Sequence, residues 1–112
     1  MGKRKFYIYQ EDLIQYKIVN THINISKMVN NINLQFCEEN MKALRSEEIT
    51  TYLEKKGFLF LDGNRKKPTT KGKLLGIKVE KCYDLKGNEY EMNIYNECAQ
   101  KYILDNLYDI IF

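Results

Sequence analysis

The segment of residues 46–61 constrains the fold more than any other, because a helical pattern there ends in a glycine and a β-type run begins at once. Apolar side chains at helical spacing predict the inner face of a helix over residues 46–56. They are Ile49, Tyr52 and Leu53. Carboxylates in the first turn and lysines in the last suit the helix dipole. Gly57 stands where a left-handed terminating residue is expected, and residues 58–61 are interpreted as a buried strand ending in the turn DGN.

The other predicted elements lie on both sides of this segment. A helix is expected from about Ser26, since apolar residues recur at intervals of three and four. These residues are Ile25, Met28, Val29, Ile32 and Phe36. Residues 5–9 (KFYIY) are interpreted as a short strand, and residues 10–19 are ambiguous between helix and strand. Residues 41–44 are a candidate for one further helical turn.

After the only proline, Thr69 or Thr70 is expected to cap a short helix that ends at Gly76. Residues 77–83 and 89–95 are interpreted as a hairpin joined by DLKGN. A last helix, capped by Asn96, is predicted to run almost to the carboxyl end. No repeat or linker is visible, so residues 1–112 are expected to form one α+β domain.

Charge is distributed unevenly along the chain. Residues 55–86 carry ten lysines and arginines against three carboxylates, a net charge of +7, whereas the remainder carries a net charge of −4. A local field of this kind concentrates polyanions near one surface. The basic stretch surrounds the only proline, in GFLFLDGNRKKPTTKGKLLGI.

Catalysis, metal binding and cofactor binding are not expected. The only histidine is His22, and no G-x-S-x-G or P-loop motif is present. Cys37, Cys82 and Cys98 are too widely spaced for a zinc knuckle and are expected to be reduced. The chain also shows no secretion signal and no apolar run of the ~20 residues that span a bilayer, so a cytoplasmic protein without a membrane partner is expected.

Residues 23–95 resemble winged helix-turn-helix modules, particularly those of small phage regulators and antirepressor carboxyl-terminal domains. The resemblance lies in the order of two helices, a glycine stop and a β-hairpin, and in the segments ITTYLEKKGFL, PTTKG and LGI. It implies a DNA-binding regulator associated with a phage or another mobile element, in which the hairpin of residues 77–95 is the wing.

On this interpretation the basic stretch and the hairpin contact DNA phosphates, which supply most of the non-specific affinity of such proteins. The candidate phosphate contacts are Arg65, Lys66, Lys67, Thr69, Thr70, Lys71, Lys73, Lys78 and Lys81. Three outward residues of the helix over residues 46–56 are candidate base contacts, and they are Thr50, Thr51 and Lys55. Glu47 and Glu48 count against a recognition helix, because carboxylates facing phosphates lower affinity.

The alternative is a protein-interaction module or inhibitor that binds a host protein and no DNA. Nine tyrosines in 112 residues suit such an interface, although tyrosine is also favoured in strands. Ile111 and Phe112 leave an apolar end, which predicts that the last helix packs on the core or forms a homodimer.

Overall fold

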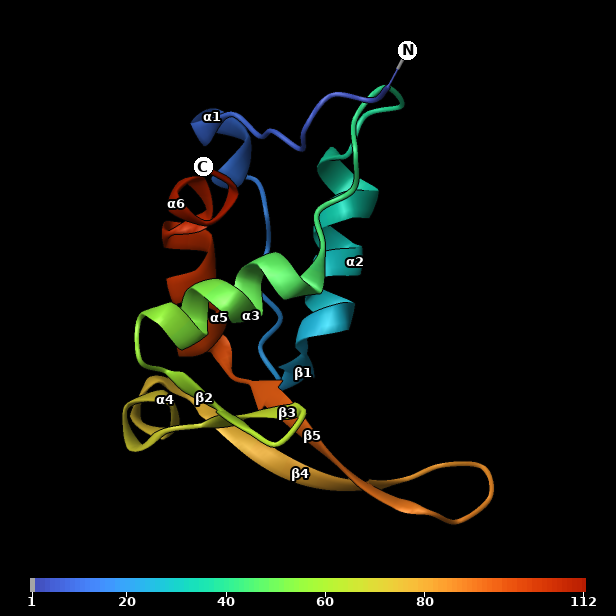
Figure 1. The fold of residues 1–112 in the computed structure, drawn as a ribbon. Coiled ribbons are helices and arrows are strands. Elements are labelled where there is room, and N and C mark those ends of the chain that lie inside the picture. The colour runs from blue at the N-terminus through green and yellow to red at the C-terminus, as the bar shows by residue number, and fades with distance from the viewer. Residues whose placement is uncertain (1) are drawn as a thin grey trace.

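Six helices and two antiparallel sheets make up residues 2–112, the part of the chain that the computed structural model describes (Figure 1). The helices are α1 (Gln10–Leu13), α2 (Ile25–Phe36), α3 (Ser46–Lys55), α4 (Thr70–Leu75), α5 (Glu97–Asp105) and α6 (Leu107–Ile111). The strands are β1 (Ile23–Asn24), β2 (Leu59–Asp62), β3 (Arg65–Pro68), β4 (Ile77–Tyr83) and β5 (Glu89–Tyr95). The chain is therefore α+β, as expected from the sequence. None of the helices in this part of the chain has the length and apolar character needed to cross a lipid bilayer.

The helix boundaries follow local capping signals. The Asn24 side chain accepts a hydrogen bond from the N–H of Lys27 and starts α2. At the start of α3 the Glu48 carboxylate accepts from the N–H of Arg45 at 3.0 Å. Gly57 adopts a φ of +89° directly after α3, which is the left-handed conformation expected of a terminating glycine. The predicted helix of residues 46–56 is thus confirmed to within one residue.

The hairpin predicted over residues 77–95 is confirmed, and it forms most of the larger sheet. The strand order is β1-β5-β4, with Ile77 opposite Tyr95 and Tyr83 opposite Glu89. The body of the protein covers only the end of this hairpin near Ile77 and Tyr95, and the remainder projects away from the helices as an arm (Figure 1). The strands β2 and β3 form a separate hairpin.

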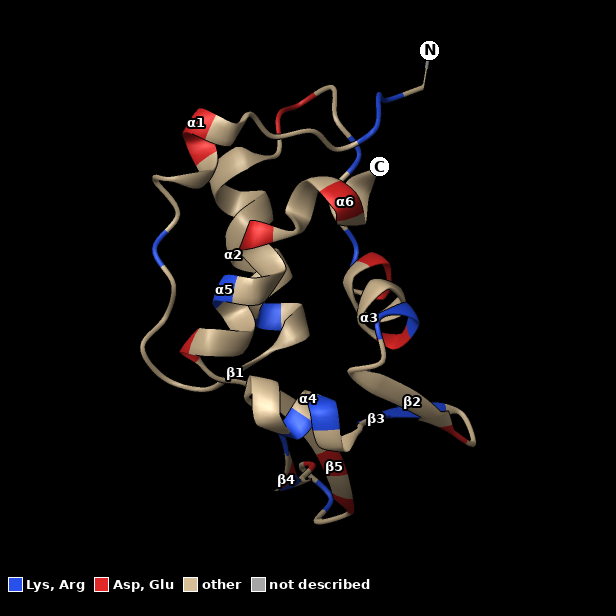
Figure 2. Cartoon of the chain, turned by 90° about the vertical axis from the view of Figure 1, so that its left-hand side faces the viewer, with Lys and Arg blue, Asp and Glu red and all other residues tan. Residues whose placement is uncertain are grey.

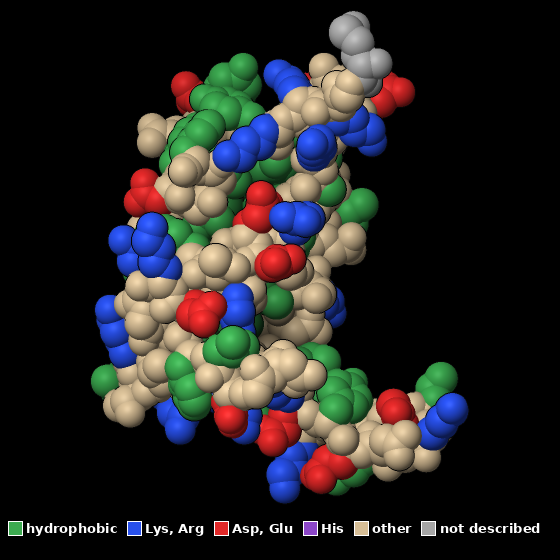
Figure 3. Space-filling view, viewed as in Figure 1, with side chains coloured by type: hydrophobic (Ala, Val, Ile, Leu, Met, Phe, Trp, Pro, Cys, Tyr) green, Lys and Arg blue, Asp and Glu red, His purple; other side chains and the backbone are tan. Residues whose placement is uncertain are grey.

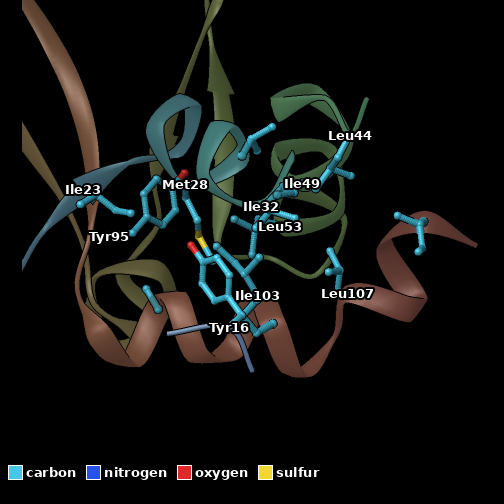
Figure 4. Close-up of a cluster of buried hydrophobic side chains, with 14 of the residues drawn as sticks. Tyr16, Ile23, Met28, Ile32, Leu44, Ile49, Leu53, Tyr95, Ile103 and Leu107 are labelled. Carbon is cyan, nitrogen blue, oxygen red and sulfur yellow. The ribbon is translucent and has the colours of Figure 1, made fainter. Parts of the chain in front are cut away.

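A single apolar core joins the two sheets to the helices, and its members come from almost the whole chain. The inner faces of α2, α3 and α5 meet around Met28, Ile32, Ile49, Leu53 and Ile103, all fully buried (Figure 4). Phe6 and Ile8 at one end of the chain and Ile111 at the other belong to the same cluster.

Several sequence-based expectations were wrong in detail. Residues 41–44 form no helical turn, and the strand expected to be buried over residues 58–61 exposes Phe60 and Leu61. Residues 5–9 contribute Phe6 and Ile8 to the core but form no strand, and the nearest pairing is a single bridge between Arg4 and Met41. Residues 65–68 were not predicted to be a strand but form β3, because their backbone pairs with β2 from Leu59 to Asp62. The last helix is broken at Asn106.

The break at Asn106 turns the end of the chain back towards the core. The Asn106 side chain donates to the carbonyl oxygen of Tyr102 at 2.8 Å, which ends α5. Helix α6 then buries Leu107 and Ile111. Phe112 is 70% exposed, with its ring 5.8 Å from that of Tyr7.

Gln100 is the one fully buried polar side chain among the described residues. Its Oε1 accepts from the N–H of Val19 at 3.1 Å, and its Nε2 lies within 3.2 Å of the carbonyl oxygens of Val19, Thr21 and Tyr95. One amide therefore satisfies the backbone of an irregular segment, residues 19–21, that has no ladder partner of its own.

We predict that Gln100→Met lowers the free energy of unfolding by about 2–4 kcal/mol, because the similar-sized side chain leaves several buried backbone groups without partners. Urea denaturation followed by circular dichroism measures the change. Gln35→Met is the matched control, since Gln35 is exposed, and it should stay within about 0.5 kcal/mol of the parent. Equal effects of the two substitutions would contradict the structural role of Gln100.

We predict that the free energy of unfolding falls at alkaline pH because of Tyr95. Burial raises the pKa of its phenol well above the ordinary value. The folded state therefore favours the neutral phenol. This preference stabilises the folded protein fully below about pH 10, and as the pH rises further the free energy of unfolding falls by up to about 1.4 kcal/mol per pH unit. Tyr95→Phe should flatten the stability curve above pH 10, whereas Tyr83→Phe, at an exposed position, should not. Parallel curves for Tyr95→Phe and the parent would refute this assignment.

Candidate nucleic-acid interface

Lys66 is a predicted phosphate contact, and the structure places it next to two predicted base contacts, Thr50 and Thr51. Its Nζ lies 3.3 Å from the Thr51 hydroxyl, 3.5 Å from that of Thr50 and 3.4 Å from the Glu54 carboxylate. The side chain is 24% exposed. The β2–β3 hairpin thus places one cation along the outer face of α3, beside two of the three candidate base contacts, Thr50 and Thr51.

Arg65 and Lys67, in contrast, are engaged elsewhere. The Arg65 guanidinium donates to the carbonyl oxygen of Glu91 and lies 3.5 Å from Oδ1 of Asn93, both on β5. Asn93 in turn donates to the carbonyl oxygen of Lys66 at 2.9 Å. Arg65 therefore connects the two sheets. Lys67 lies 3.0 Å from the Asp62 carboxylate across its own hairpin, so part of its charge is neutralised.

The PTTKG segment forms a structural joint between α3 and α4. The Thr69 hydroxyl donates to the carbonyl oxygen of Gly57 at 2.6 Å and accepts from the N–H of Gly72 at 3.0 Å. Lys71 donates to the carbonyl oxygen of Lys56 at 2.8 Å. A Cβ at Gly72 would overlap the carbonyl oxygen of Phe58, so this residue must be glycine. We name these contacts the α3–α4 joint.

The remaining predicted contacts are exposed and dispersed. Thr70 and Lys73 lie on α4, which follows the joint (Figure 2). Lys78 and Lys81 lie on β4, where Lys81 is 3.6 Å from Glu89. Lys55 is exposed at the end of α3.

The distal hairpin arm, residues 80–91, is acidic, contrary to the expectation that it extends the basic strip. It carries four carboxylates against two lysines. Hydrogen bonds from the N–H groups and side chain of Asn88 and from neighbouring amides lower the pKa of Asp84, which keeps the turn negatively charged. A wing of this charge does not favour contact with phosphates.

A cationic group that combines two distant parts of the chain lies at the start of α3. Lys5, Lys42 and Arg45 line a hollow of about 480 Å³, together with Phe6 and Glu48. In Figure 3 basic side chains gather above α3, with acidic side chains among them at mid-height, and again along the left side, where α3 ends. Lys42 and Arg45 directly precede the helix, so their charge was visible in the sequence. The approach of Lys5 depends on tertiary structure alone.

The other end of α3 is also cationic. Lys55 and Lys56 border a second hollow, and the Lys56 ammonium lies 5.5 Å from the centre of the Tyr52 ring. Lys71 follows on α4, with its Nζ 4.5 Å from the Phe58 ring centre. A helix of 10 residues is about 15 Å long, so two cationic groups lie about that distance apart.

Within residues 2–112 no group of histidine, cysteine and carboxylate side chains is arranged to hold a metal ion. Cys37, Cys82 and Cys98 are free thiols. Comparisons with protein-family models, curated proteins and solved structures found no match.

We predict that Thr69→Val lowers the free energy of unfolding by about 1–2 kcal/mol, because it removes both the α4 cap and the hydrogen bond to Gly57. Thr70→Val is the matched control. Its side chain is exposed and makes no hydrogen bond within the described residues, so a change below about 0.5 kcal/mol is expected. Thermal unfolding distinguishes the two, and equal destabilisation would argue against the joint.

Proposed function

We propose that the protein binds double-stranded DNA through α3, in a winged-helix arrangement, as a regulator of the phage or mobile-element type. The observation that carries this proposal is the position of cations at both ends of α3. Lys5, Lys42 and Arg45 lie near its start, and Lys55 and Lys56 lie at its end. We call these residues the two end groups of α3. Between them, the exposed ridge of α3 is formed by Glu47, Thr51 and Lys55.

The length of α3 fits this mode of binding. The B-DNA major groove is about 12 Å wide and admits one helix, and α3 is about 15 Å long. With α3 in the groove, its two end groups reach the phosphates on either side. The centre of the exposed ridge then presents Thr51, with Thr50 and Lys66 beside it, to the base edges.

Two of the three carboxylates of α3 are engaged in contacts within the protein, which reduces their repulsion of DNA phosphates. Glu54 lies 3.4 Å from the Lys66 ammonium, and Glu48 accepts from the N–H of Arg45. Glu47 remains exposed at the first turn. At that position a carboxylate is suited to accept from a cytosine amino group.

We predict that affinity for duplex DNA falls steeply with salt, and that each end group contributes to the slope. Lys42→Ala/Arg45→Ala and Lys55→Ala/Lys56→Ala should each reduce the slope of log K against log salt by up to about 1.8, because each phosphate contact contributes about 0.9. Filter binding at several salt concentrations measures the slope.

The matched control is Lys17→Ala/Lys101→Ala, which removes two exposed lysines outside α3 and its surroundings. It should leave the slope within experimental error of the parent. A slope that falls equally in all three double variants, or no measurable affinity at low salt, would contradict binding through α3.

A second function, protein binding without DNA, is favoured by the hairpin arm. The arm exposes Tyr83 at the end of β4, Leu85 in the turn and Tyr90 on β5, and its net charge is negative. Aromatic side chains at an exposed, projecting position are typical of protein interfaces. Two results together would support this alternative. The protein would show no salt-dependent affinity for DNA, and a pull-down would recover the same protein reproducibly with the parent but not after substitution of Tyr83 and Leu85.

A further inference from the structure

The outer edge of β4 carries no partner strand within the described residues. In the order β1-β5-β4 this strand is last, and Lys78, Val79, Glu80 and Lys81 are all exposed. The exposed part of this edge, residues 78–81, presents backbone donors and acceptors that another strand can use.

The hydrogen bonds at the two ends of the ladder show which β4 groups point outward. Asn96 donates to the carbonyl oxygen of Gly76, and Asp84 donates to that of Asn88, both at 3.0 Å. Hydrogen-bonded and non-hydrogen-bonded pairs alternate along an antiparallel ladder. Even-numbered residues of β4 therefore bond to β5, and the N–H and C=O groups of Ile77, Val79 and Lys81 point to the open edge.

The hydrogen bonds of β5 show the same alternation, because the carbonyl oxygen of an odd-numbered residue points away from β4. Glu91 is opposite Lys81, and its carbonyl oxygen accepts from Arg65 instead of from β4. The outward groups of Ile77, Val79 and Lys81 take part in no backbone hydrogen bond outside the strands in residues 2–112.

The charges along β4 are complementary to a second copy of β4 in one register. In an antiparallel pair related by a two-fold axis, a register centred on Val79 places Lys78 opposite Glu80 of the other copy, twice. Registers centred on Lys78, Glu80 or Lys81 place like charges directly opposite each other, which is destabilising. A register centred on Cys82 brings Glu80 opposite Asp84.

The same register also satisfies the backbone. Val79 meets Val79 as a hydrogen-bonded pair that uses the outward groups. Ile77 is buried at the covered end of the hairpin, so it lies outside the exposed part of this edge. Lys78 and Glu80 then form non-hydrogen-bonded pairs, in which opposite side chains lie closest. We propose that the protein forms a homodimer by antiparallel pairing of the two β4 strands about a two-fold axis at Val79.

This pairing accounts for exposed apolar residues beyond the strand. Past Gly76 the turn of the partner hairpin runs towards α4. Leu74 on α4 is 85% exposed, and Leu85 in the hairpin turn is fully exposed. Lys73 beside Leu74 and Asp84 beside Leu85 carry opposite charges. The interface therefore extends by an apolar contact with a complementary charge at its margin.

A charge exchange tests the proposal in the absence of DNA. Lys78→Glu alone and Glu80→Lys alone each turn two attractive pairs into two repulsive ones, and each should weaken dimerisation at least about tenfold. The double variant Lys78→Glu/Glu80→Lys restores opposite charges and should recover the parent dissociation constant to within about threefold. Sedimentation equilibrium over a range of protein concentrations measures all four proteins.

Two controls separate this interface from others. Lys17→Glu makes the same charge change at an exposed position outside β4, α4 and the hairpin turn, and should leave the dissociation constant nearly unchanged. Phe112→Ser tests the alternative dimer through the last helix and should also have no effect. A parent protein that remains monomeric at millimolar concentration, a double variant no better than the single ones, or dissociation by Phe112→Ser would each overturn the proposal.

Discussion

The arrangement of the molecule depends on the α3–α4 joint, in which Thr69 satisfies the backbone at the end of one helix and at the start of the next. A helix end leaves carbonyl groups without partners. Here the carbonyls of Lys56, Gly57 and Phe58 accept from Lys71 and from the hydroxyl and N–H of Thr69. Because both ends of the β2–β3 hairpin are fixed at this joint, the hairpin has to lie alongside α3.

This constraint determines which cations of residues 55–86 make contacts within the fold. Lys71 and Arg65 donate to backbone carbonyls, and Lys67 contacts a carboxylate. Part of the positive charge of residues 55–86 is therefore engaged in contacts within the fold. Lys66 reaches the outer face of α3 because the hairpin places it there. The cations nearest to the ends of α3 are Lys55 and Lys56, with Lys5, Lys42 and Arg45 from outside that stretch. Lys73 and Lys78 also remain exposed, on α4 and β4.

Local patterns predicted the elements whose causes are local. The cap at Asn96, the glycine after α3 and the hairpin of residues 77–95 depend on neighbouring residues and were confirmed. Strand β3 was not predicted, because its lysines and arginine resemble a solvated turn until pairing with β2 is known. The buried position of Gln100 follows from contacts about 80 residues apart, which no local pattern contains. For the same reason the partners of Arg65 and the approach of Lys5 to Arg45 required the structure.

Chemical-shift mapping of the isotope-labelled protein with a short DNA duplex tests the central claim most directly. Binding through α3 predicts that the largest amide shifts fall in residues 42–56 and at Lys66, with smaller changes at Lys5. The distal arm, residues 80–91, should show almost none, since its carboxylates outnumber its lysines. Shifts concentrated in that arm, or none at all at low salt, would contradict the account.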